Sequence, residues 1–85
     1  MKKVKLVKIG DYNLYTFSDG KNEYKKNIFF EDFKPSVGDI LFFPNKVLEE
    51  INLFTYGPLL KDAKVEEAIK IIHDGKEIFM SRYYG

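Results

Sequence analysis

The sequence contains no cysteine, a single histidine and a single arginine among its 85 residues. Without cysteine the chain has no disulfide, no thiolate nucleophile and no sulfur ligand for a metal. His73 has no second histidine with which to build a typical zinc site, and Arg82 alone offers bidentate recognition of phosphate. The sequence also lacks a glycine-rich phosphate loop. We therefore expect no enzyme activity, and we predict no catalytic residue, no cofactor and no metal.

Charge and hydropathy argue against DNA-binding, membrane and secreted proteins. Fourteen basic and thirteen acidic residues leave a net charge of +1, so the total charge draws the chain neither to DNA nor to an anionic membrane. No run approaches the ~18 apolar residues of a membrane span. Lys5 and Lys8 interrupt the apolar stretch that a signal peptide would need after its basic start. We expect a cytoplasmic protein that does not enter a membrane.

Aromatic residues are abundant, with eight Phe and six Tyr. Large rings bury much area per residue, which suits the small core of one short domain, residues 1–85. The most informative segment is 34–44, where a turn-forming cluster precedes the apolar run Ile40–Phe43 and Pro44 ends it. Such a run predicts a short strand that is buried on both faces. On this interpretation Phe42 is a core residue, and Phe42→Ala costs about 3–5 kcal/mol.

Apolar alternation predicts further strands over residues 4–9, 12–17, 23–31, 53–56, 68–72 and 77–82. The adjacent Leu6 and Val7 break the first alternation, which indicates a bulge. At Gly10-Asp11 two alternatives stay open, a hairpin turn or one long strand that bends there. Asp74-Gly75 predicts a hairpin turn, although the spacing of apolar residues over 62–72 is also compatible with a helix.

One short helix is predicted near residues 45–52, because Asn45 can cap it and Val47, Leu48 and Ile51 share a face. Strands on both sides of one helix favour a mostly β fold. We predict a five- to seven-stranded barrel or rolled sheet, OB-like with an SH3-like topology as the alternative.

Isolated titratable residues have ordinary structural explanations. His73 falls in a predicted turn, so we expect a solvent-exposed turn histidine. Asp11, Asp19 and Glu23 lie in or near the first two turns, where aspartate is favoured for backbone reasons; turn formation is a better explanation than a cation site. Neighbouring glutamates, as in Glu49-Glu50, point apart and predict a solvated face.

Lysines and tyrosines form the constellation that indicates binding. Rings on a sheet face beside lysines can stack bases and follow a phosphate backbone, whereas Tyr and Arg at the C-terminus suit a protein partner. The competing explanation is that the rings are core and the lysines protect strand edges. The Arg82–Gly85 tail resembles that of short bacterial proteins, a resemblance that implies no activity. The candidate surface comprises Lys5, Lys8, Tyr12, Tyr15, Tyr24, Lys25, Lys26, Arg82, Tyr83 and Tyr84.

The sequence thus predicts a non-enzymatic binding module. A protein partner is the first expectation, and single-stranded nucleic acid is the alternative. The oligomeric state stays open.

Overall fold

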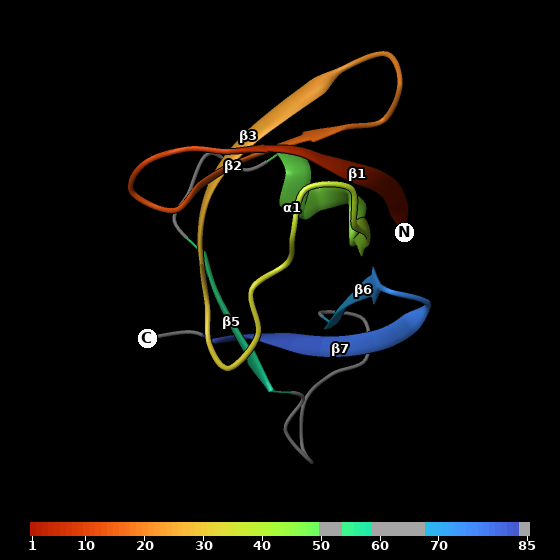
Figure 1. Cartoon of the computed structure of the whole chain (residues 1–85). Coiled ribbons are helices and arrows are strands. Elements are labelled where there is room, and N and C mark those ends of the chain that lie inside the picture. The colour runs from red at the N-terminus through yellow and green to blue at the C-terminus, as the bar shows by residue number, and fades with distance from the viewer. Residues whose placement is uncertain (50–53, 59–67, 84–85) are drawn as a thin grey trace.

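The strands of this chain close into a barrel in the computed structural model, which describes residues 1–49, 54–58 and 68–83 (Figure 1). In this described part, seven strands and one helix follow along the chain: β1 (Lys2–Ile9), β2 (Leu14–Ser18), β3 (Glu23–Phe30), β4 (Ile40–Phe43), α1 (Asn45–Glu49), β5 (Phe54–Pro58), β6 (Ala68–His73) and β7 (Lys76–Tyr83). The predicted mostly β barrel with a short helix is confirmed.

The order of strands around the barrel is β1-β2-β3-β5-β7-β6-β4, and β4 pairs back onto β1. Neighbouring strands are antiparallel except β3 and β5, which are parallel. A parallel pair needs a long crossover connection, and here β4 and α1 lie within it. Because the sheet closes on itself, each of the seven described strands has a neighbour on both sides and none is an edge strand.

Two features of the first hairpin were expected from sequence. The register between β1 and β2 shifts between Leu6 and Lys8, so the predicted bulge is confirmed. Residues 10–13 form a turn between antiparallel strands, with the Leu14 amide donating to Asp11 O at 3.2 Å. The hairpin alternative at Gly10-Asp11 is therefore the correct one.

The last hairpin also follows the prediction. Asp74 and Gly75 both have positive φ, 49° and 76°, as a two-residue type I′ turn requires. Residues 68–72 are strand in β6, and the rest of the ambiguous segment, 62–67, lies outside the described residues. For the predicted helix near 45–52, α1 covers Asn45–Glu49, and 50–52 likewise fall outside.

The side chains of β4 alternate between the barrel interior and its outer surface. Leu41 and Phe43 are completely buried, whereas Ile40 and Phe42 are only partly buried. The prediction that this run is buried on both faces is therefore wrong for its outer face. Alternate residues of a barrel strand point inward and outward, and an unbroken apolar run does not reveal which environment its outward residues meet.

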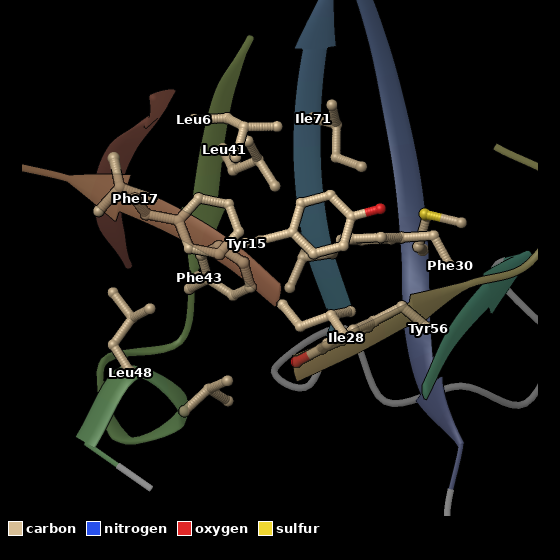
Figure 2. Close-up of a cluster of buried hydrophobic side chains, with 14 residues drawn as sticks. Leu6, Tyr15, Phe17, Ile28, Phe30, Leu41, Phe43, Leu48, Tyr56 and Ile71 are labelled. Atoms are coloured by element: carbon tan, nitrogen blue, oxygen red, sulfur yellow. The ribbon is translucent and has the colours of Figure 1, made fainter. Parts of the chain in front are cut away.

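Aromatic rings fill the barrel interior (Figure 2). The Tyr15 and Phe30 rings meet edge to face with centroids 5.1 Å apart, as do those of Phe17 and Phe43. Val47 and Leu48 of α1 belong to the same buried cluster. With the interior packed in this way, the surfaces available for binding lie on the outside of the barrel.

Candidate binding surfaces

Three residues of the predicted binding surface belong instead to the barrel interior or its margin. Tyr15 is 3% exposed and Lys26 is 7% exposed. The two are register partners on β2 and β3, and both face inward. Tyr24 is partly buried, and its hydroxyl donates to Asp19 Oδ2 at 3.1 Å. The expectation that rings of the candidate surface lie on a sheet face where they can stack bases is therefore wrong for Tyr15 and Tyr24, because strand parity turns both toward the core.

The remaining candidates are on the outside or incompletely described. Lys5, Lys8, Tyr12 and Lys25 are exposed, and Arg82 is partly exposed. Tyr83 belongs to β7, but its side chain, like all of Tyr84, lies outside the described part of the structure. Of the ten candidates, Lys8, Tyr12 and Lys25 share one concave surface.

This concave surface lies beside the β1–β2 turn and is called here the Tyr12 hollow. Its volume is about 530 Å³. It is lined by Lys8, Gly10, Asp11, Tyr12, Leu14, Thr16 and Lys25. Lys8, Thr16 and Lys25 are register partners across β1, β2 and β3, so the two lysines flank a common floor.

Tyr12 occupies an unusual backbone conformation. It has φ 58°, as does Asn13, and the residue is 92% exposed. A two-residue turn of this kind favours Asn and Gly, and a bulky residue in the left-handed region is strained by about 1 kcal/mol or more. Hydrogen bonds from Asn27 Nδ2 to Tyr12 O (3.1 Å) and from the Ile28 amide to Asn13 O (3.0 Å) hold the turn against β3. The fold supplies no packing reason for a tyrosine here.

A second surface, called here the β4 outer wall, was not among the sequence-based candidates. Its apolar members are Ile40, Phe42, Ile72 and Phe79, and its lysines are Lys3, Lys5 and Lys70. Two cross-strand rows over β1, β4, β6 and β7 contain them: Lys3-Phe42-Lys70-Phe79 and Lys5-Ile40-Ile72-Glu77. The signal that could have found this wall was in the sequence, because strand alternation in Ile40–Phe43 must turn two of four apolar residues outward.

Lys70 links the members of the wall. Its Nζ lies 4.6 Å from the centroid of the Phe42 ring and 3.6 Å from Glu77 Oε1. Phe79 is 45% exposed, and beside it is an apolar depression of about 120 Å³ to which Met1 also contributes. The wall therefore combines the exposed Phe79 ring, the partly buried Phe42 ring, an apolar depression and positive charge.

The opposite margin of the wall is also hollowed. A hollow of about 400 Å³ is lined by Lys3, Lys5, Val7 and Ile40 together with residues 18–20 at the end of β2 and in the turn that follows. Val7 is the bulge residue of β1 and is 38% exposed. The wall is thus bounded on both sides by concave surface.

His73 is not the freely exposed turn residue that the sequence predicted. It ends β6, and its Nδ1 lies 2.9 Å from Asp39 Oδ2, while its Nε2 lies 3.3 Å from Asp74 Oδ2. The Phe33 ring packs edge to face against the imidazole at 5.2 Å. Because Asp39 is 34 residues away along the chain, only the adjacent Asp74 could be identified from the sequence as a carboxylate near His73. This cluster joins the turn before β4 to the β6–β7 hairpin.

The acidic turn residues take ordinary structural roles. Asp19 Oδ1 accepts from the amides of Lys21 (2.8 Å) and Asn22 (2.7 Å), and Lys2 Nζ lies 3.0 Å from Asp19 Oδ2. The backbone donors of Asn22 and Lys21, followed by Lys2, hold the pKa of Asp19 well below its usual range. The turn-forming explanation for Asp19 is confirmed. Among the described residues, no group of three or more metal-ligating side chains converges.

Across residues 1–49, 54–58 and 68–83, no helix has the length and apolar character needed to span a membrane. No protein-family model, curated protein or solved structure matches this chain.

Proposed function

We propose that this protein is a non-enzymatic binding module that holds a protein partner against the β4 outer wall. The observation that carries the proposal is the apolar character of both faces of β4. Ile40 and Phe42 face outward and are only partly buried, although they are as apolar as the inward Leu41 and Phe43. The solvent side of an antiparallel sheet is ordinarily polar, and contiguous exposed apolar surface is typical of interaction sites.

The charges around the wall favour a particular partner chemistry. Its two rows contain three basic residues, Lys3, Lys5 and Lys70, and one acidic residue, Glu77. A partner segment with apolar side chains and carboxylates would match both the rings and the lysines. A second copy of this chain is a poorer match, since a self-complementary contact would set lysines against lysines. We therefore infer a heterotypic partner with an acidic, apolar segment.

Two further parts of the proposal rest on general arguments. A non-enzymatic role is supported by an interior filled with side chains, which leaves little room for a deep reactive site. We keep a cytoplasmic location and an OB-like topology, with SH3-like second, as predictions. The barrel has seven strands in its described part, whereas an OB-fold has five. The binding proposal does not depend on the topology, because it requires only the β4 outer wall.

Selection from a displayed library of random peptides tests the proposal. We expect enriched peptides to combine apolar and acidic residues, because these complement the wall. Phe79→Ser should weaken the selected peptides about tenfold or more, as loss of an aromatic interface anchor does. Phe29→Ser is the matched control, since Phe29 is exposed to a similar degree (49% against 45%) but lies on β3.

Three results would contradict the proposal: no enrichment, equal losses for Phe79→Ser and Phe29→Ser, or enrichment of basic peptides. Sedimentation of the free protein tests self-association separately. A dimer that Phe79→Ser dissociates would replace the heterotypic partner by a second copy of the chain.

A further inference from the structure

The Tyr12 hollow is not explained by the proposed function. The β4 outer wall lies on β1, β4, β6 and β7, whereas the hollow lies over β1, β2 and β3. In Figure 1 the β1–β2 turn is at the left of the barrel and the β6–β7 turn is at its right. A ligand in the hollow therefore need not compete with a partner on the wall.

The hollow offers a flat ring and positive charge. The Tyr12 ring is almost fully exposed and its backbone is held in an anchored turn, so only the side-chain torsions need to be ordered when a planar group stacks on the ring. Lys8 and Lys25 are separated by the single strand β2, which places their backbones about 10 Å apart. This spacing lets both ammonium groups reach one anionic group.

We propose that the Tyr12 hollow binds a nucleotide, with the base stacked on Tyr12 and the phosphate held between Lys8 and Lys25. Base stacking on an aromatic ring, with lysine contacts to phosphate, is the general mode of recognition for unpaired nucleotides. Asp11, in the same lining, can accept a hydrogen bond from a base amino group or a ribose hydroxyl. The volume of about 530 Å³ lies within the usual range for small-molecule sites.

An acidic peptide fits the hollow less well. Carboxylates would satisfy the lysines, but they would leave the exposed ring without a stacking partner and would approach Asp11. A duplex is also a poor fit, because its bases are not available for stacking. The same nucleotide chemistry can come from a free mononucleotide or from a single strand, and the experiment separates these two sources.

The test is a titration of the isotope-labelled protein at low salt, followed by amide chemical shifts and tyrosine fluorescence. The probes are adenosine and uridine monophosphates, short single-stranded oligonucleotides, an abasic oligonucleotide and inorganic phosphate. We expect shifts at the β1–β2 turn with the nucleotides and oligonucleotides. Salt should weaken binding with a logarithmic slope of about −0.7 per phosphate contacted, the value for single strands.

Variants at Tyr12 separate loss of the ligand contact from loss of the fold. Tyr12→Gly should weaken binding about 5- to 150-fold, the range for loss of one stacked base. Glycine adopts positive φ without strain, so the melting temperature of this variant should not fall. Tyr12→Phe should retain binding, because the ring remains. Lys8→Gln and Lys25→Gln should each reduce the salt slope, while Lys76→Gln, in the β6–β7 hairpin, should not.

The outcomes are decisive in either direction. Equal affinity for mononucleotides and oligonucleotides would support the site as one for free nucleotides, and tighter binding of oligonucleotides would support a strand. No binding at low salt, or unchanged binding by Tyr12→Gly, would overturn the proposal. So would binding of inorganic phosphate as tight as that of the mononucleotides, or binding of the abasic strand as tight as that of the strands that carry bases. Phe79→Ser should leave nucleotide binding intact and Tyr12→Gly should leave peptide binding intact, so each proposal can fail without the other.

Discussion

Replacing Phe43 by alanine tests the packing on which the barrel depends. Phe43 is fully buried, and its ring meets Phe17 at 5.1 Å and Tyr56 at 6.3 Å between centroids. Truncation of a buried Phe costs about 3–5 kcal/mol, from lost transfer energy and the cavity left behind. A chain of 85 residues has a free energy of unfolding of about 4–13 kcal/mol by the usual scaling. Phe43→Ala should therefore remove much of the stability of the protein.

The neighbouring Phe42 provides the matched control. It has the same side chain on the same strand, but it faces outward, is only partly buried and packs under the Lys70 ammonium. Partial burial and an exposed cation–π contact together account for about 1–2 kcal/mol. The expectation from sequence, about 3–5 kcal/mol for Phe42→Ala, is thus revised to the smaller value.

Urea unfolding followed by far-UV circular dichroism measures both variants against the parent protein. The midpoint should fall much further for Phe43→Ala than for Phe42→Ala, with similar slopes if both variants unfold in two states. Equal losses would refute the inward and outward assignment of β4. A loss below about 1 kcal/mol for Phe43→Ala would refute the packed interior itself.

Two further predictions concern the turns. The pKa of Asp19 is lowered in the folded protein, so its contribution to stability is present above about pH 4 and is lost as the pH falls from there toward the lowered pKa. Asp19→Asn should therefore flatten the acid limb of a curve of stability against pH. An unchanged acid limb would contradict this prediction. His73→Ala should lower the free energy of unfolding by about 1–3 kcal/mol, because it leaves the largely buried Asp39 carboxylate without its imidazole partner. Calorimetry should show no comparable loss for Lys76→Ala in the same hairpin. Equal losses in the two variants would exclude a specific role for the His73–Asp39 contact.

Much of the fold was accessible from sequence because it is encoded locally. Asp74-Gly75 specifies its own turn, since both residues tolerate positive φ. The adjacent Leu6 and Val7 indicated the bulge, because two apolar neighbours break the alternation of a strand, and Val7 is the extra residue that the register skips. Where the sequence left alternatives, as at Gly10-Asp11, both were locally allowed and only the pairing of β1 with β2 chose between them.

The candidate surfaces were less accessible for a physical reason. Composition identified tyrosines and lysines, but strand register decided that Tyr15 and Lys26 face inward while Lys8 and Lys25 face outward. Tyr12 was a candidate from the start, yet its strained and exposed conformation is a property of the closed hairpin.

The residues alone fix that this chain builds a small aromatic core from short strands, because alternation and turn residues act over a few neighbouring positions and no cysteine is present to form a disulfide. Tertiary structure alone decided which side of each strand meets solvent and which distant residues meet. Closure of β4 onto β1 turned Ile40 and Phe42 outward, and the packing of β6 beside β4 brought His73 to Asp39. These are long-range contacts, and their geometry depends on the whole barrel.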